Sequence, residues 1–165
     1  MHRTGKPVGE VNRYEERNNL IEDINSSNID EVLPLIRKYQ EFYKVQNIDD
    51  KKNKIFFSQF GIESNKGCLF GYRKDNKLVA FTTIYFSYVS SSISRIAVMN
   101  DLYTLPEYRK QGIGKKLIQY CEKYSKTKGA SRLQWLTAPD NTVAQSLYKS
   151  IGAKQSSWEL FIYST

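Results

Sequence analysis

Three consecutive stretches of apolar, β-branched and aromatic residues most constrain the fold of this chain. Cys68–Tyr72 and Leu78–Tyr88 are joined by the polar segment 74–77, which has the length of a turn between antiparallel strands. A third stretch, Ile93–Thr104, follows a serine-rich turn and ends before Pro106. The pattern therefore predicts an antiparallel sheet.

Helical spacing of apolar residues appears on both sides of these strands. The expected helices are one capped by Asn28 or Ser27 that runs to Phe42 or Tyr43, one over Lys51–Phe60, one from Gly112 to about Gly129, and one capped by Asp140 that stops at Gly152. Further short strands are expected at Leu20–Ile24, Leu133–Leu136 and Trp158–Tyr163. Antiparallel strands followed by a βαβ-like crossover predict an α+β fold, with a mixed, mostly antiparallel twisted sheet and helices on both faces.

Length and composition bound the class of protein. The chain has 165 residues, of which 40% are hydrophobic and 13% aromatic, enough for the core of one globular domain. We expect that domain over residues 19–165, after a mobile N-terminal tail at 1–18 without a recognisable targeting signal. No stretch approaches the roughly 18 apolar residues of a membrane span, so no membrane partner is expected.

Histidine and cysteine are too scarce for several kinds of chemistry. The single histidine, His2, lies in the polar N-terminal stretch, which argues against Ser-His-Asp, Cys-His and histidine-metal sites; no metal is expected. Cys68 and Cys121 lack metal-ligand spacing and are expected to be small buried hydrophobic residues. A reducing, cytoplasmic location fits this cysteine usage best.

Positive charge is concentrated in one segment. The formal net charge is +8, and Arg109–Arg132 holds eight basic residues against one acid, Glu122. Such a cluster is typical of a solvated helix face or of a site for a polyanion. DNA or RNA would also be attracted, but no nucleic-acid-binding motif is recognised in the chain, so we do not expect a nucleic-acid partner.

The segment Thr104–Lys115 has the features of an anion site. It runs from a predicted strand through a basic loop into a helix that begins at Gly112. Glycines permit close approach of a ligand to the backbone, and free N–H groups and the helix dipole favour negative charge. Neither the phosphate loop of nucleotide triphosphatases nor the three-glycine dinucleotide motif is present, so a diphosphate of another kind is expected. On spacing alone, Gly-Ile-Gly could instead be a purely structural helix start.

Two sequence blocks resemble a known family. Arg109-Lys110-Gln111-Gly112-Ile113-Gly114 is similar to the R-x-x-G-x-G acyl-CoA signature of the GCN5-related N-acetyltransferases (GNAT). Asn141-x-x-Ala144-x-x-Leu147-Tyr148-x-x-x-Gly152-Ala153 resembles a later pattern of the same family. The resemblance implies the acyl-CoA N-acyltransferase fold and acetyl-CoA as the acetyl donor.

The resemblance also implies which residues hold the cofactor. Backbone N–H groups of 111–115 would bind the pyrophosphate, the strand at 102–104 would pair with the pantetheine arm, and Asn141 would contact the cofactor. The full set of implied cofactor-binding residues is Leu102, Tyr103, Thr104, Arg109, Lys110, Gln111, Gly112, Ile113, Gly114, Lys115 and Asn141.

Two residues are the catalytic candidates. Tyr148 matches the family tyrosine whose phenol donates a proton to the departing sulfur, and a tyrosine with an ordinary pKa of about 10 stays protonated near neutrality. Asp101 lies at the end of the predicted strand, where a carboxylate could accept the proton of the amine, directly or through water. Packing for Tyr148 and a strand-end hydrogen bond for Asp101 are the structural alternatives.

The expected function is transfer of an acetyl group from acetyl-CoA to a primary amine of a small molecule by direct attack. Acetylation of a protein lysine or N-terminus, or a non-catalytic module that binds CoA or nucleic acid, are the alternatives. Asn100 stands where a polyamine-acetylating branch of the family carries a second acid, which makes long polyamines a second choice. Aromatic residues are available to wall an acceptor pocket, although core packing is the more common role: Trp135, Tyr39, Tyr43, Tyr85 and Trp158. A homodimer paired through the C-terminal strand would also fit the sequence.

Overall fold

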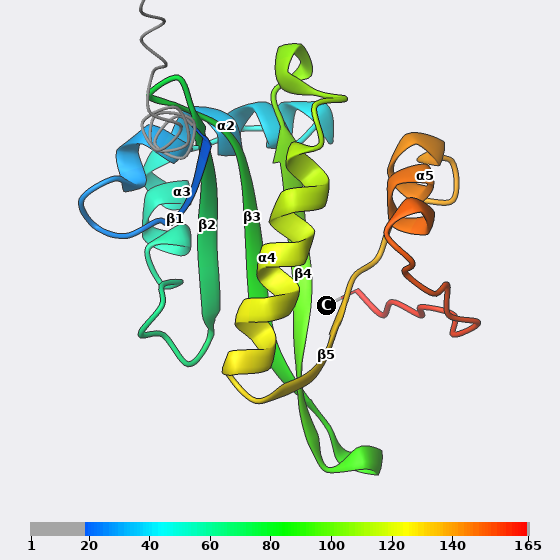
Figure 1. The fold of residues 1–165 in the computed structure, drawn as a ribbon. Helices are drawn as coiled ribbons and strands as arrows, with labels where there is room; N and C mark the ends of the chain where they lie inside the picture. The colour runs from blue at the N-terminus through cyan, green and yellow to red at the C-terminus, as the bar shows by residue number, and fades with distance from the viewer. Residues whose placement is uncertain (1–18, 165) are drawn as a thin grey trace, which may run out of the picture. The chain divides into compact units, whose positions relative to one another are not determined.

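A computed structural model of the chain describes residues 19–164, and the expected tail at 1–18 lies outside the described residues (Figure 1). The chain divides into two compact units, one that ends at Trp135 and one that begins at Leu136. No helix within residues 19–164 has the length and apolar character needed to cross a membrane.

A five-stranded sheet forms the centre of the first unit. Its strands are β1 (Asn19–Asp23), β2 (Gly67–Lys74), β3 (Lys77–Val89), β4 (Ser94–Thr104) and β5 (Ala130–Gln134), in the spatial order β1-β2-β3-β4-β5. The first four strands are antiparallel to their neighbours, whereas β5 is parallel to β4. The predicted α+β class with a mixed, mostly antiparallel sheet is thus confirmed.

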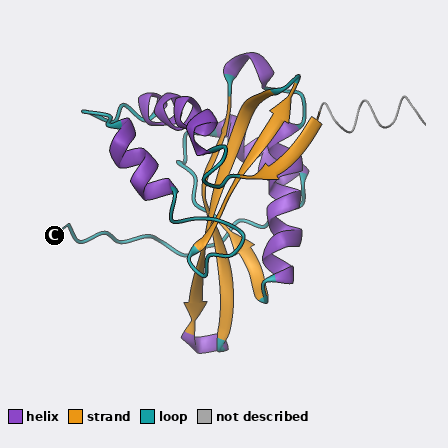
Figure 2. Ribbon diagram, turned by 90° about the vertical axis from the view of Figure 1, so that its left-hand side faces the viewer, coloured by secondary structure: helices purple, strands orange, loops and turns teal. Residues whose placement is uncertain are grey.

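Three helices cover the two faces of this sheet (Figures 1 and 2). Helices α2 (Ile29–Phe42) and α3 (Asp50–Phe57) pack on one face and α4 (Ile113–Thr127) on the other; single 3₁₀ turns lie at Ser90–Ser92 and Pro106–Tyr108. On the α2/α3 face, the rings of Tyr39 and Phe57 contact Phe81 of β3. On the α4 face, Tyr120 and Tyr124 contact Phe70 of β2, and Cys121 is fully buried, as is Cys68 of β2.

A β-bulge interrupts the pairing of β3 with β4. Ile84 pairs with Met99 but Thr83 pairs with Asp101, so Asn100 is one extra residue on β4. Successive side chains of a strand point to opposite faces, so one extra residue reverses the faces of everything that follows. The bulge therefore places Asp101 on the α2/α3 face of the sheet, together with Thr83, Tyr85 and Phe81.

The second unit contains helix α5 (Thr142–Ser150). Two expectations from the sequence are wrong in this unit. The cap is Asn141, not Asp140, since the Asn141 Oδ1 atom accepts a hydrogen bond from the Ala144 N–H at 3.2 Å. The segment Trp158–Tyr163 forms no strand within the described residues. A strand requires a hydrogen-bonded neighbour, and no strand of the described residues pairs with this segment.

Candidate active site

The edge of β4 that faces β5 is open along the second half of the strand. Pairing between β4 and β5 ends at Val98 and Gln134, whereas β4 continues to Thr104. Residues 99–104 therefore have β3 on one side and no paired strand on the other within the described chain. An unpaired strand edge offers backbone donors and acceptors to an extended ligand.

Two residues of β4 direct their backbone groups toward this edge. Leu105 donates its N–H to the Val79 carbonyl at 2.9 Å, and antiparallel pairs that exchange such bonds alternate with pairs that do not. Asp101 and Tyr103 accordingly face β3, while Leu102 and Thr104 face the open edge. The Thr104 carbonyl accepts a hydrogen bond from the Arg109 Nε at 3.0 Å, in agreement with this alternation. Of the three strand residues implied by the resemblance, Leu102 thus presents its N–H and carbonyl at the open edge, and Thr104 presents its N–H there.

After β4, the loop that contains Gly112 leads into helix α4. Gly112 has the left-handed φ of +76°, and a Cβ placed there would meet no atom within 4 Å. The first helical hydrogen bond runs from the Lys116 N–H to the Gly112 carbonyl at 3.0 Å, which leaves the N–H groups of 113–115 outside the helical ladder. The N-terminus of α4 therefore has free backbone donors beside an open glycine.

The N-terminus of α4 carries positive side chains beside the positive end of its helix dipole. Helices α2 and α3 carry acids in their first turn, whereas the first turn of α4 has none and includes Lys115 and Lys116. Cations at a helix N-terminus are unfavourable. A bound phosphate would interact favourably with both the helix N-terminus and the two lysines.

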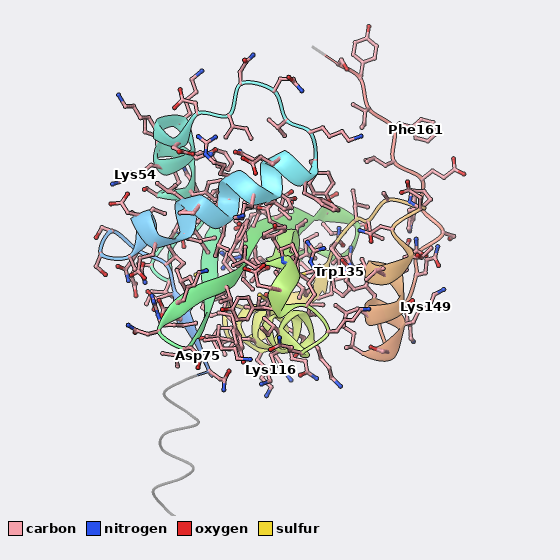
Figure 3. The ribbon with its side chains drawn as sticks, turned by 90° about the horizontal axis from the view of Figure 1, so that it is seen from above. Lys54, Asp75, Lys116, Trp135, Lys149 and Phe161 are labelled. Carbon is pink, nitrogen blue, oxygen red and sulfur yellow. The ribbon has the colours of Figure 1, made fainter. Side chains whose placement is uncertain are left out.

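Side chains from other elements hold the loop in place. Lys74 of β2 donates from Nζ to the Gln111 Oε1 atom, and Gln111 donates from Nε2 to the Glu107 carbonyl at 3.4 Å. The Arg109 guanidinium lies over the rings of Tyr103 and Phe42, at 5.6 and 5.9 Å from their centroids. Lys116, labelled in Figure 3, donates to the Tyr72 hydroxyl at 3.3 Å. Lysine and arginine side chains thus gather around the motif from β2, the loop and α4.

Asp101 is a buried carboxyl group with an incomplete set of partners. The residue is 4% exposed, and its Oδ1 atom accepts a hydrogen bond from the Asn100 amide at 3.2 Å. Its Oδ2 atom and the hydroxyl of Thr83, its partner in the register, are buried without a hydrogen-bond partner in the described residues. None of the ion pairs within residues 19–164 involves Asp101. A buried carboxylate without a cation is costly.

Burial raises the pKa of the Asp101 carboxyl above its ordinary value of 3.8, while the Tyr39 and Thr83 hydroxyls and the Asn100 amide face it and lower the pKa in turn. Burial and the Asp101 charge likewise raise the pKa of Tyr39, and raise the pKa of Tyr85 to about 12. Asp101 is therefore a stronger base than an exposed aspartate, and both phenols remain protonated at neutral pH.

Replacement of Asp101 by asparagine should stabilise the fold at neutral pH. Asp101 has a higher pKa in the folded chain than in the unfolded chain, so the folded chain keeps the Asp101 proton at a higher pH. The free energy of unfolding therefore falls as pH rises from the ordinary pKa of 3.8 through the raised pKa, and it stays lower above that pH. Asp101→Asn removes this loss. Melting curves from pH 4 to 8 should show a higher Tm for the variant at neutral pH and a difference that vanishes near pH 4.

The control is Asp75→Asn, which removes a carboxylate from the exposed turn between β2 and β3 and should leave Tm unchanged (Figure 3). A lower Tm for Asp101→Asn than for the wild-type protein at pH 7 would contradict the buried-charge account.

The structure brings most of the predicted site residues into the first unit. Asp101, residues 102–104 and the loop 109–115 follow one another along β4, the loop and the first turn of α4. Asn141 and Tyr148 belong to the second unit, where Asn141 caps α5 and Tyr148 lies in its last turns. The sequence did not indicate Thr83, because its pairing with Asp101 depends on a register shift that has no local sequence signal.

Comparison with known proteins assigns the class. A mixed sheet whose open β4 edge leads into a basic glycine loop is the framework expected of an acyl-CoA N-acyltransferase. The model of the Acetyltransferase (GNAT) family matches residues 32–153. The chain therefore belongs to the GNAT family and is an N-acetyltransferase, which excludes the non-catalytic alternative.

Individual relatives agree with this assignment. The chain is 27% identical over 135 residues to the uncharacterised N-acetyltransferase YhfO of Bacillus subtilis, across 82% of this chain and 89% of that protein. It is 29% identical over 143 residues to the thialysine N-epsilon-acetyltransferase of Bos taurus, across 82% and 84%. The crystal structure of a probable acetyltransferase superposes with a TM-score of 0.76 at 26% identity, across 88% of this chain and 99% of that one.

Proposed function

We propose that this protein transfers the acetyl group of acetyl-CoA to the primary amine of a small molecule by direct attack of the amine on the thioester. The observation that carries the proposal is the continuity of the open β4 edge with the basic N-terminus of α4. Enzymes of the GNAT family use acetyl-CoA. Relatives named for the acetylation of thialysine and of aminoglycosides support a small amine as the acceptor.

The cofactor would lie along residues 102–115. The backbone N–H and carbonyl of Leu102 and the N–H of Thr104 suit an extended amide-containing chain such as the pantetheine arm. The free N–H groups of 113–115, with Gly112 open above them, suit a pyrophosphate. Charge and hydrogen bonds around the pyrophosphate would come from Arg109, Lys110, Lys115 and Gln111. Ile113 fixes the helix start through its buried side chain, and Gly114 has no side chain that could obstruct the N–H groups beside it.

The chemistry needs a base, an oxyanion donor and an acid. The Asp101 carboxylate takes a proton from the ammonium group, and the neutral amine attacks the thioester carbon while a β4 N–H donates to the developing oxyanion. The carbon–sulfur bond breaks, and Tyr148 gives a proton to the thiolate. The acylated nitrogen loses its second proton, which returns the Tyr148 phenol to its neutral form through water, and Asp101 releases the first proton to solvent. An ammonium ion and acetyl-CoA thus yield an N-acetylated amine, free CoA and one proton, with no acetyl-enzyme formed. Asn141 would support the cofactor through its place at the start of α5.

Replacement of Tyr39 by phenylalanine should shift the pH dependence of catalysis. The Tyr39 hydroxyl lowers the pKa of Asp101, so its removal raises that pKa further. The acidic limb of the kcat/KM profile, which reports ionisation of the base in the free enzyme, should move to higher pH.

Tyr85→Phe is the matched control, because the Asp101 charge acts on Tyr85 but Tyr85 is not among the groups that shift Asp101. An acidic limb that stays in place or moves to lower pH in Tyr39→Phe would argue against Asp101 as the base.

The test of the proposed function is a panel of acceptors assayed for free CoA at fixed acetyl-CoA. Monoamines, amino acids, aminoglycosides, spermidine and a lysine-containing peptide represent the competing classes. Release of CoA with small monoamines supports the proposal, whereas activity confined to the peptide would assign the protein-acetylating alternative. Because Asn100 stands beside Asp101 in place of a second acid, spermidine should be a poorer acceptor than a monoamine.

A further inference from the structure

Thr83 is a buried polar side chain that the sequence did not single out. Thr83 is 0% exposed, and its hydroxyl has no hydrogen-bond partner in the described residues. The neighbouring Thr82 has the ordinary arrangement, since its hydroxyl donates to the Asp101 carbonyl at 2.7 Å. An unpartnered buried hydroxyl destabilises a fold, so a ligand that completes its bonding would account for it.

The bulge at Asn100 sets this hydroxyl beside the free oxygen of Asp101. Thr83 and Asp101 are directly paired across β3 and β4, and both lie on the α2/α3 face of the sheet. Thr83 Oγ1 and Asp101 Oδ2 each lack a partner within hydrogen-bond distance in the described residues, and they belong to directly paired residues, so one ligand group can bind both. The matching ligand group has several donors and a positive charge, which describes an ammonium group.

Aromatic residues lie on the same face of the sheet as this pair. The Tyr39 ring lies 5.7 Å from Phe81 and 6.1 Å from Tyr103, centroid to centroid, and Tyr85 stacks obliquely on Phe60 at 4.9 Å. Phenol and ring faces accommodate cations. Asp101 is only 4% exposed, so a ligand group that reaches it must be narrow.

We propose that Thr83 is a specificity-determining residue, which with Asp101 Oδ2 binds the ammonium group of the acceptor and selects a primary amine carried on an unbranched methylene. Because Asp101 and Thr83 are both buried, an ammonium group on a branched α-carbon should reach them less well than one on an unbranched methylene. One carboxylate neutralises one positive charge, so a second ammonium group on the acceptor gains nothing at this site.

The experiment measures acceptor kinetics of Thr83→Val with n-butylamine. The comparison is made at a pH above the acidic limb, where Asp101 is ionised in both enzymes, because the Thr83 hydroxyl also lowers the pKa of Asp101. A hydrogen bond to a charged group is lost, so KM for the amine should rise about tenfold or more, while kcat and the Tm increase on addition of acetyl-CoA stay near wild type. Thr83→Ser keeps the hydroxyl and should restore the wild-type KM. If Thr83→Val does not fold, Thr83→Ala removes the same hydroxyl in a smaller side chain.

Ser125→Ala is the matched control. Ser125 in α4 also carries a buried hydroxyl without a partner in the described chain, but on the opposite side of the sheet. Removal of either hydroxyl should leave Tm unchanged or raise it. Only removal of the Thr83 hydroxyl should raise KM for the amine. A Thr83→Val enzyme with the wild-type KM, or an equal rise in Ser125→Ala, would overturn the proposal.

The shape of the acceptor is tested with isomers. Wild-type kcat/KM should be about tenfold or more higher for n-butylamine than for sec-butylamine, which differs only in its branched α-carbon. Equal values would refute the selection of an unbranched methylene. This role of Thr83 rests on the proposed function, and the wild-type enzyme separates failure of the one from failure of the other. If the wild-type enzyme releases no CoA with any amine, the proposed function is wrong. If the wild-type enzyme is active and Thr83→Val has the same kinetics, only the role of Thr83 is wrong.

Discussion

Replacing Tyr148 by phenylalanine is expected to lower kcat by about tenfold to a thousandfold, with little change in acetyl-CoA affinity. The substitution keeps the aromatic ring and removes only the hydroxyl that would protonate the leaving thiolate. Steady-state kinetics with a saturating amine, together with the melting temperature of the acetyl-CoA complex, measure the two effects separately. A loss confined to kcat distinguishes proton donation from a role in packing.

The matched control is Tyr88→Phe, which removes a phenol from the exposed end of β3 and should retain wild-type kcat. Wild-type turnover in Tyr148→Phe would assign Tyr148 to the packing of α5. Equal losses in the two variants would show that removal of a phenol has a general effect.

Replacing Gly112 by aspartate should abolish the stabilisation that acetyl-CoA gives to the wild-type protein. Saturating cofactor at about a hundred times Kd stabilises the folded state by about 2.7 kcal/mol, which corresponds to a rise in Tm of about 5 to 10 °C. The aspartate carboxylate would project into the open space beside the N–H groups that should bind the pyrophosphate. Like charges then exclude the cofactor.

Two controls separate charge from backbone strain. Gly112→Asn has the same size and the same tolerance of the left-handed φ but no charge, and it should keep most of the Tm increase. Gly129→Asp places the same residue at a φ of +77° with open space around it, at the other end of α4. It should lower the melting temperature of the free protein slightly and leave the acetyl-CoA increase intact. Loss of the increase in all three variants would contradict a phosphate site at Gly112.

Local sequence patterns predicted the sheet and the helices where each element is defined by its own residues. The β2–β3 hairpin follows from two apolar stretches and a polar turn in which Asp75 and Asn76 adopt left-handed φ values of 49° and 63°. The start of α4 at Gly112 follows from the glycine and the apolar spacing behind it. Such features need no knowledge of distant contacts, so the sequence alone was sufficient for them.

Features that depend on pairing between strands could not be predicted in this way. The extra residue at Asn100 carries no sequence signal of its own, yet it decides that Asp101 faces Tyr39 and Thr83 instead of α4. The apolar residues of 158–163 favour a strand, but residues 136–164 supply no partner strand. Asp140 and Asn141 are equally good caps by residue type, and only the geometry of the turn selects Asn141.

A single-turnover reaction tests the central claim most directly. The wild-type protein, in excess over acetyl-CoA, is mixed with n-butylamine, quenched at intervals, and analysed by mass spectrometry for free CoA, N-acetylbutylamine and acetylated protein. Direct transfer predicts that CoA and N-acetylbutylamine appear together in equal amounts and that the mass of the protein never changes. An acetylated protein that forms before the product and then decays, or CoA released without an acetylated amine, would contradict it.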